Sequence, residues 1–528
     1  MAKALSNTQI LRAAAVVVVG FLASGLLGLV RTAAFSATFG TSELLDSFYA
    51  AQRIPETLFV LVAGGALGSS FIPVFTRFLN QGDQAGAWRL ASAVMSCATG
   101  LAALLALVIG IFAPSLIPIL APEATPSMQA LTIDLTRLML VTVVIFSISG
   151  LLMGILNAQQ MFTLPALALA FNNLGQIFGA LVLVRLLPDE SKVYGLAFGA
   201  ILGSVLHLAV QLPGLRRSGA KLAFLPNPRV PGVIEVLTLM LPRVLGLAVV
   251  QINFLVNLSL TSGMVVGSYT ALNTAWGLMF FALGVIAQSV GTAVFPSLSA
   301  LAAKGDMDGF KDRLAGALRS VLFLSFPATL GLITLGQVGI SVLLQYGAWT
   351  PESTAATAWA LSFFAIGIAG HSLLEVLSRA FYALADTRTP VAVGVASMIA
   401  NIALSLILIR LIGDPTSLSR GSFAGLALAN SLATLLEGAA LWLILRRRIG
   451  GLKDRFVLDG AARSLAAALG MGALVAVFVW ALDGVGVGRL ITALIAGAVG
   501  VGTFFALALV LRLDEARTIP RLLLRRGR

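Results

Sequence analysis

Two arginines stand inside the apolar runs near the start of the chain. Arg31 lies as many residues before Ser42 as Arg53 lies after it, and Ser42 belongs to the polar stretch "GTSELLD" between two runs. At the helical rise of 1.5 Å per residue, both guanidinium groups are expected about 16 Å below this turn, at matching depth. Asp46 falls on the helical face of Arg53, and Glu56 follows Arg53 by one turn.

This combination suits the binding of a phosphate or pyrophosphate. Guanidinium groups bind such anions bidentately. An arginine at the centre of a bilayer costs about 2.5–3.5 kcal/mol to insert, so it normally faces a bundle interior or a wet cavity. We expect Arg31, Asp46, Arg53 and Glu56 to line a substrate cavity. The alternative is an internal ion-pair network that only locks the hairpin.

The composition places these residues in a membrane protein. The 528 residues are 58% hydrophobic and 11% charged, whereas soluble domains carry about 25% charged residues. Apolar runs of roughly 20 residues recur, each long enough to span a bilayer. We predict an all-α polytopic fold with about 14 transmembrane helices, at 10–38, 45–76, 88–113, 128–156, 161–187, 193–215, 233–262, 267–300, 314–345, 354–384, 390–412, 422–446, 460–482 and 489–512.

The basic residues behind the net charge of +13 are distributed along the chain as the predicted topology requires. Lys and Arg gather at alternate connections, for example at 216–229 and 446–463, and in the tail from Arg512 to Arg528, whereas "GTSELLD" and "QYGAWTPES" have none. This positive-inside pattern predicts cytoplasmic termini. The basic excess is therefore a topology signal that can also contact membrane lipids, and a nucleic-acid partner is not expected.

Motifs for other chemistry are missing from the sequence. The single cysteine, Cys97, excludes an internal disulfide, and His207 and His371 stand apart in separate apolar runs. No metal site, cofactor or enzymatic nucleophile is predicted, and "AGGALGSS" lacks the Lys-Ser/Thr ending of a P-loop. Proline and glycine inside spans favour bending, so we predict kink or gating positions at Pro55, Gly64, Gly65 and Pro242.

The chain contains an internal repeat. The spacing from Pro165 to Pro390 also separates Arg185 from Arg410. Gly82-Asp83 likewise matches Gly305-Asp306 at nearly the same spacing. We predict six-helix lobes at 1–222 and 223–450, and two additional helices with a basic cytoplasmic tail at 451–528. Because each repeat has an even number of spans, the lobes should be related by a pseudo-twofold axis along the membrane normal, as in parallel-repeat transporters.

Six segments resemble the MurJ (MviN) family of lipid II flippases, of the multidrug/oligosaccharidyl-lipid/polysaccharide exporter superfamily. They are "LGLVR", "LDSFYAAQRIPETLFVLVAGGALGSSFIPVF", "GILNAQQMFTLPALA", "LPRVLGLAVVQINFLV", "TAVFPSLS" and "SRAFYALADTRTPV". The resemblance implies a multi-pass protein of the bacterial cytoplasmic membrane that moves lipid-linked peptidoglycan precursor to the outer leaflet by alternating access. It implies a role in cell-wall synthesis and cell shape, with cell-wall synthesis proteins as possible partners.

The resemblance retains Arg31, Asp46 and Arg53 and departs from the family elsewhere. Gly25, Phe59 and Gly277 stand where family arginines are expected. Arg53 or Arg243 could supply the cavity charge instead, although snorkelling also accounts for Arg243. Three functions stay open: lipid II transport, transport of another polyprenyl-pyrophosphate-linked glycan or a small molecule, and a non-transporting paralogue that serves as an envelope-assembly scaffold.

Overall fold

The computed structural model describes residues 7–62 and 65–518, and within them every regular element is a helix. The first ten helices are α1 (Asn7–Phe39), α2 (Glu43–Val62), α3 (Gly65–Asn80), α4 (Gln84–Leu120), α5 (Pro126–Ala158), α6 (Thr163–Phe178), α7 (Val184–Leu186), α8 (Tyr194–Ala209), α9 (Leu212–Arg217) and α10 (Val233–Thr261). A π-helical turn, η1 (Gly179–Leu183), joins α6 to α7, and a short 3₁₀ turn, η2 (Asp189–Ser191), precedes α8.

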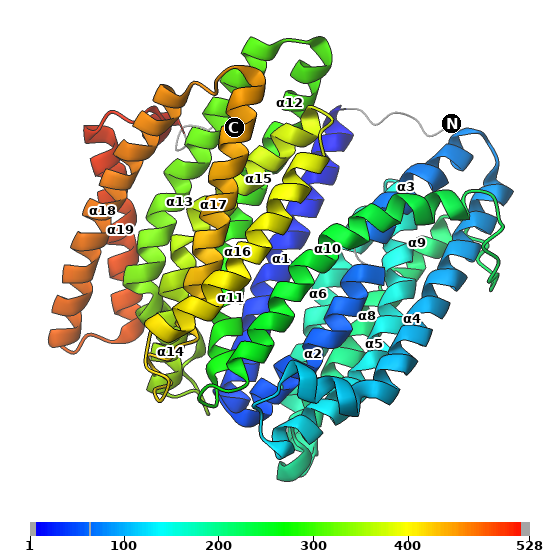
Figure 1. The fold of residues 1–528 in the computed structure, drawn as a ribbon, viewed down its shortest axis with the longest axis horizontal. Helices are drawn as coiled ribbons and strands as arrows, with labels where there is room; N and C mark the ends of the chain where they lie inside the picture. The colour runs from blue at the N-terminus through cyan, green and yellow to red at the C-terminus, as the bar shows by residue number, and fades with distance from the viewer. Residues whose placement is uncertain (1–6, 63–64, 519–528) are drawn as a thin grey trace. The chain divides into compact units, whose positions relative to one another are not determined.

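The remaining helices follow the same long, apolar pattern. They are α11 (Ser268–Leu283), α12 (Ser289–Lys304), α13 (Met307–Leu344), α14 (Pro351–Ile366), α15 (Ile368–Ala383), α16 (Arg388–Leu411), α17 (Ala424–Ile449), α18 (Asp454–Gly484) and α19 (Arg489–Val510). A second π-helical turn, η3 (Gly284–Gln288), makes α11 and α12 one continuous rod. Figure 1 shows both sets of helices in ribbon form.

The all-helical polytopic fold is confirmed. Among the described residues, eleven helices are long and apolar enough to cross a membrane, or up to thirteen when each of two bent helix pairs counts as one span. Each of these thirteen coincides with a predicted span. The predicted span 45–76 is not among them: α2 has 20 residues but carries the charged Asp46, Arg53 and Glu56, and α3 has only 16 residues. Residues 63–64, between these helices, lie outside the described part.

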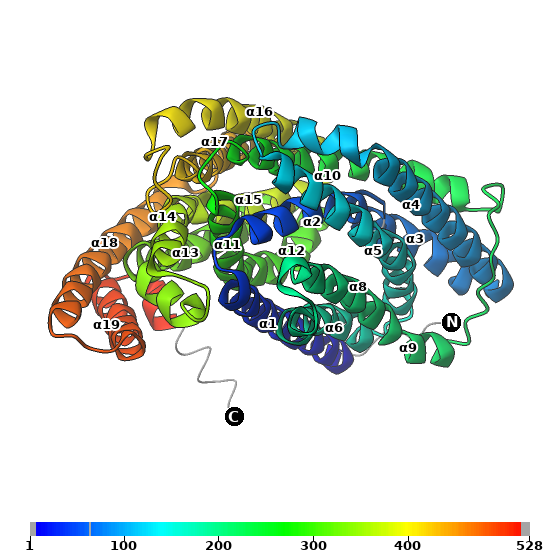
Figure 2. The same cartoon turned by 90° about the horizontal axis from the view of Figure 1, so that it is seen from below.

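The chain divides into two compact units, unit 1 up to Gly267 and unit 2 from Ser268. In unit 1, α4 and α5 pack along one another, and α6 packs between α1 and α8 (Figure 2). Close approach of α6 and α8 depends on glycine: a Cβ added to Gly175 of α6 would lie 2.4 Å from the Cα of Gly203 of α8. Small residues at a membrane-helix interface allow such contact and strengthen van der Waals packing.

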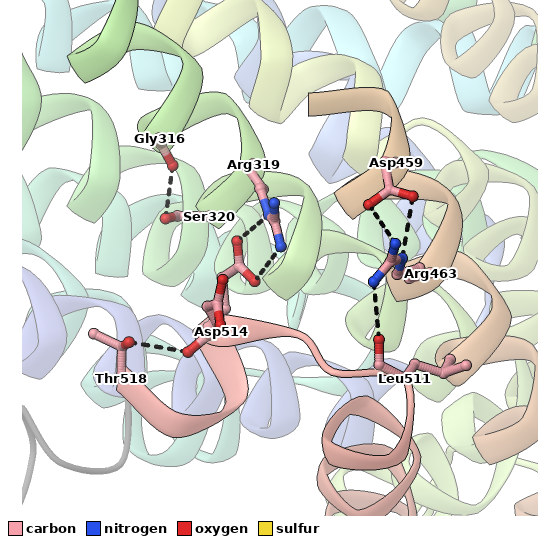
Figure 3. Close-up of polar contacts among 9 residues, drawn as sticks. Gly316, Arg319, Ser320, Asp459, Arg463, Leu511, Asp514 and Thr518 are labelled. Carbon is pink, nitrogen blue, oxygen red and sulfur yellow. Dashed lines mark hydrogen bonds and ion pairs between the residues drawn. The ribbon is translucent and has the colours of Figure 1, made fainter. Parts of the chain in front are cut away.

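In unit 2, the last two helices attach to α13. Phe323 of α13 packs with Phe504 of α19, their ring centroids 5.0 Å apart. The buried Arg319 of α13 forms an ion pair with Glu515, just after α19, and its guanidinium carbon lies 4.4 Å from the ring centroid of Phe456. Figure 3 shows Arg319 pointing toward the segment that follows α19. Apolar packing and a shielded ion pair thus hold α18 and α19 on unit 2.

Local features recur at the spacing that the sequence repeat predicts. Pro165 and Pro390 are each the third residue of their helix, α6 and α16, and both are buried. Gln160 and Ala385, separated by the same spacing, both have left-handed backbone, with φ of 64° and 59°. Such φ values are uncommon for residues other than glycine. The turns before α6 and α16 thus have a left-handed residue at matching positions.

The helix cap before α4 is repeated before α13. Asp83 accepts the N–H of Gly86, and Asp306 accepts the N–H of Gly309, at 2.7 and 2.9 Å. The predicted lobe boundaries and the axis between the lobes stay predictions. Helix α10, which the sequence repeat assigns to the second lobe, packs against α2, α3 and α4 of unit 1.

Candidate functional site

The hairpin of α1 and α2 carries the predicted arginines as the sequence suggested. Phe35 of α1 contacts Tyr49 of α2, with ring centroids 6.4 Å apart. Arg31 lies one turn before Phe35, and Arg53 one turn after Tyr49, so the two arginines occupy the next level deeper in the hairpin. The Arg31 guanidinium carbon is 5.9 Å from the Phe35 ring centroid.

Arg31 is half-buried and its polar atoms are only partly satisfied. Its Nε is shielded from solvent and has no hydrogen-bond partner within the described residues. A buried guanidinium N–H without an acceptor is costly, and a bound anion would supply one. The cavity-lining role of Arg31 stays a prediction.

Arg53 is held from two directions. Its Nη1 lies 3.2 Å from the Glu56 carboxylate, and its guanidinium carbon lies 4.4 Å from the ring centroid of Phe254 on α10. The side chain of Arg53 is 9% exposed and that of Glu56 is 50% exposed. The structure therefore brings Arg53 and Glu56 together, and an anion approaching Arg53 would compete with Glu56.

The α2–α10 contact continues with polar side chains. Thr57, one turn after Arg53, donates a hydrogen bond to the Gln251 side-chain oxygen at 3.3 Å. On α10, the Oδ1 atoms of Asn253 and Asn257 are buried and have no hydrogen-bond partner within the described residues. Orphaned amide oxygens in an apolar helix bundle mark a polar region of this helix. Sequence reasoning missed these amides, because they carry no charge.

Asp46 lies in the first turn of α2 and ties this helix to the end of unit 1. Its Oδ2 accepts the backbone N–H of Gly267 at 2.6 Å, and the aspartate is 4% exposed. Gly267 has φ +92°, and a Cβ there would lie 2.7 Å from atoms of Thr41. The turn thus requires glycine, and Asp46 satisfies its N–H.

Arg243 lies on α10 in contact with α3. Its Nη1 donates to the Ser70 hydroxyl at 3.1 Å, and the arginine is exposed. Since Arg243 precedes Phe254 by eleven residues, it lies about 16 Å along α10 from the level of Arg53. Arg243, at the α10–α3 contact, and Arg53, at the α2–α10 contact, therefore lie at different levels along α10.

Of the predicted bending positions, Gly65 and Pro242 lie at helix breaks. Pro55 is buried inside α2. Gly65 begins α3, and Gly64 lies outside the described residues. The axis of α10 turns by 50° between its segments Val233–Leu241 and Gly246–Thr261, and Pro242 stands at this break. A gating role for these positions stays a prediction.

Two of the positions where family arginines are expected have different surroundings. The Phe59 ring packs on Phe146, with centroids 4.9 Å apart, and Phe146 contacts His207 edge-on at 5.3 Å. Phe59 thus belongs to an aromatic cluster of unit 1. In unit 2, a Cβ added to Gly277 would meet no described atom within 4 Å. At Phe59 an aromatic contact takes the place of the expected arginine. At Gly277 the expected arginine is absent and the space beside the helix is open.

Sequence reasoning also missed carboxylates inside the spans of unit 2. Glu375 of α15 pairs with Arg379 at 2.6 Å, and Glu437 lies in the middle of α17. The signal was present, since both stand within apolar runs, where an ionisable residue is a candidate for function. In the part of the chain that the structure describes, no three His, Cys, Asp or Glu residues gather as a metal site requires.

Comparisons with known proteins identify the family of this chain. Residues 35–495 match the family model described as "Lipid II flippase MurJ". A protein of that name from Burkholderia cenocepacia is 31% identical over 434 residues, covering 81% of this chain and 82% of the relative.

Two solved structures share the fold. One, described as "Lipid II flippase MurJ, inward closed conformation", covers 94% of this chain and 99% of its own with a TM-score of 0.77 at 22% identity. The other, an inward-facing multidrug resistance MATE family transporter of the MOP superfamily, covers 82% of this chain and 96% of its own with a TM-score of 0.68 at 15% identity. The chain belongs to the MurJ family of lipid II flippases, which are membrane transporters.

Proposed function

We propose that this protein moves lipid II, the lipid-linked peptidoglycan precursor, from the inner to the outer leaflet of the bacterial cytoplasmic membrane. The observation that carries the proposal is the family match over residues 35–495. A lipid-linked pyrophosphate is an anion that must be shielded during passage through the bilayer. Guanidinium groups at membrane depth provide that shielding without a covalent step.

Within this proposal, Arg31 is the arginine that contacts the pyrophosphate. Its buried Nε lacks an acceptor among the described residues, whereas Arg53 is already in contact with Glu56 and Phe254. Arg53 then contributes positive potential from the same level of the hairpin, and Glu56 releases it when the anion arrives. The basic connections predict that both termini are cytoplasmic.

The direct test is replacement of an essential lipid II flippase by this protein in a bacterial depletion strain. Growth on this protein alone supports the proposal, and loss of cell shape followed by lysis, with the protein present in the membrane, contradicts it. Variants at Arg31 locate the site. Arg31→Ala should abolish flipping with the protein still inserted, and Arg31→Lys should recover part of it, because lysine keeps the charge without the planar fork.

The surroundings of Phe59 favour a substrate other than lipid II as the alternative. The ring at this position packs in an aromatic cluster, so an apolar contact takes the place of the expected arginine. A cavity with fewer cations suits a different polyprenyl-pyrophosphate-linked glycan. Flipping of fluorescent lipid II and of a second lipid-linked oligosaccharide, measured side by side in proteoliposomes, separates the two substrates.

A further inference from the structure

The chain between α9 and α10 forms an extended strap on the surface of unit 1. The strap comprises residues 220–230, which belong to no helix. The N–H of Ala223 donates to the Ser92 hydroxyl at 3.1 Å, and the N–H of Leu225 donates to the Ser96 hydroxyl at 2.8 Å. Two buried serines of α4 thus hold the strap along that helix. In Figure 2 the green trace from α9 to α10 passes beside α4.

The strap runs along α4 and then turns back. Its hydrogen bonds advance from Ser92 to Ser96, which is about 6 Å along the helix. The Asn227 side chain then accepts the backbone N–H two residues later at 2.9 Å and so stabilises a turn. At Gly232 the chain again lies beside the early part of α4, because a Cβ there would come 3.2 Å from the Leu90 side chain.

The exposed face of α4 marks the level of the bilayer. Large apolar side chains on one face of this helix are exposed from Leu101 to Ile119, a stretch of about 27 Å. Between Gln84 and Gly100 no large apolar side chain is exposed. The hydrocarbon core of a bilayer is about 30 Å thick. The exposed stretch therefore matches the hydrocarbon core, which begins near Leu101.

The strap lies next to this boundary. Along α4, Ser96 precedes Leu101 by about 7.5 Å and Ser92 precedes it by about 13.5 Å. The polar headgroup region adds roughly 5–7 Å on each side of the hydrocarbon core. Leu225, which is bonded to Ser96, is thus at the edge of the headgroup layer, and Phe224 is its neighbour in the chain.

The side chains of the strap have two different environments. Leu222 and Leu225 pack against the apolar core of unit 1. Phe224, between them in the sequence, is 83% exposed. A phenyl ring left in water forgoes the free energy of apolar burial. At the membrane surface the same ring can insert among the lipids, as the apolar residues of interfacial segments do.

The charges around Phe224 in the sequence are all positive. Four exposed cations occur in α9 and in the strap: Arg216, Arg217, Lys221 and Arg229. Within the described residues, none of the four forms an ion pair. Residues 210–234 contain no Asp or Glu, and Glu235 is already paired with Arg77. Unpaired cations at the level of the headgroups favour anionic lipids.

We propose that the strap is a binding surface for anionic phospholipids. Phe224 inserts among the lipids, and the four cations contact their phosphate groups. A soluble acidic protein is a poorer fit, because it would have to enter the headgroup layer to cover the ring. The basic connections predict that the leaflet concerned is the cytoplasmic one. This surface stands apart from the arginine hairpin and does not depend on which substrate the protein transports.

Insertion of residue 224 is tested on the full-length protein in liposomes, by electron paramagnetic resonance of a nitroxide label in a Cys97→Ala background. A label on Phe224→Cys should be severalfold less accessible to a neutral nickel chelate than a label on Asp189→Cys, whose side chain is fully exposed. A label on Leu107→Cys, from the exposed apolar face of α4, gives the hydrocarbon reference. Chelate accessibility at residue 224 equal to that at residue 189 overturns the proposal.

The preference for anionic lipid is tested by adding phosphatidylglycerol to phosphatidylcholine liposomes. Phosphatidylglycerol should lower the chelate accessibility at residue 224 further, and exchange of the four cations for glutamine should abolish this dependence. The matched control exchanges four exposed cations elsewhere and should keep it: Arg185, Arg410, Arg420 and Arg489. Equal accessibility in both lipid mixtures, or loss of the dependence in the control, overturns the proposal.

A milder variant keeps the test decisive if the fourfold exchange prevents insertion. Lys221→Gln combined with Arg229→Gln removes the two cations of the strap and leaves those of α9 in place. It should weaken the response to phosphatidylglycerol, because each cation near an anionic surface contributes about fivefold to binding. An unchanged response in this variant would show that the strap does not bind the anionic headgroups.

Discussion

The Arg53 guanidinium lies over the ring of Phe254, 4.4 Å from its centroid, although the two residues belong to helices far apart in the sequence. Both residues lie within unit 1. This contact makes a charge tolerable inside an apolar helix pair, since the ring face attracts a cation. It also joins α2 to α10 at the level of the candidate site.

The energy of this contact is measurable by a double-mutant cycle. We expect Arg53→Gln and Phe254→Leu to be non-additive, with a coupling of about 0.5–2 kcal/mol, because each change alone removes the same cation–π interaction. Thermal or denaturant unfolding in detergent gives the four stabilities. Additive effects would show that the two side chains are neighbours without mutual stabilisation.

Asp46 is expected to be needed for folding. Asp46→Ala removes the acceptor of the Gly267 N–H and should destabilise the protein by about 1–3 kcal/mol, with lower membrane abundance. Gly267→Ala should have a similar effect, because its φ is positive and Thr41 occupies the space. Asp189→Asn changes a fully exposed carboxylate and serves as control. A normal membrane abundance and a normal Tm of Asp46→Ala would show that Asp46 is not needed for folding.

Restoring an arginine should have opposite results at two positions. Gly277→Arg should accumulate to a higher level than Phe59→Arg, since no described atom lies within 4 Å of the added Cβ. Phe59→Arg breaks the contact with Phe146 and should cost about 3 kcal/mol or more, as for loss of a packed aromatic ring. Membrane abundance and Tm of both variants provide the comparison. Equal behaviour would contradict the difference in packing.

Acid stability should depend on Asp386, in the connection between α15 and α16. Hydrogen bonds from the Thr389 hydroxyl and backbone N–H lower the pKa of Asp386 to about 2, with help from the paired Arg448. A lowered pKa means that the carboxylate stabilises the folded state above about pH 4, and that this contribution is lost as the pH falls toward about 2.

The corresponding variant is Asp386→Asn. It should lower Tm at neutral pH and flatten the acid limb of the Tm profile, because the titrating group is gone. Asp189→Asn, whose side chain is fully exposed, should leave the profile unchanged. A wild-type profile in Asp386→Asn would show that this carboxylate does not contribute to stability.

The topology is tested by cysteine labelling in a Cys97→Ala background. Ser353 would be a poor site, because it is 1% exposed and forms a capping box with Thr350. Exposed alternatives are Asp189→Cys and Glu352→Cys, which should react with an impermeant reagent from outside, while Lys221→Cys should not. The reverse pattern would place both termini outside the cell.

Local sequence signals were sufficient to predict the spans, the internal repeat and the depth of the two arginines in the first hairpin. Hydropathy is a property of a short window, and the depth of Arg31 and Arg53 follows from helical rise alone. Turn features such as the Asp83 and Asp306 caps are equally local, because donor and acceptor stand three residues apart.

Only the tertiary structure decided which helix faces which. The contacts of Arg53 with Phe254, of Asp46 with Gly267 and of Phe59 with Phe146 each join different helices or a helix and a distant turn. Apolar helices of similar composition offer many pairings of nearly equal hydrophobicity, so the pattern in one helix does not select its neighbour. Small residues, ring contacts and buried hydrogen bonds make that selection, and they exist only after the helices have packed.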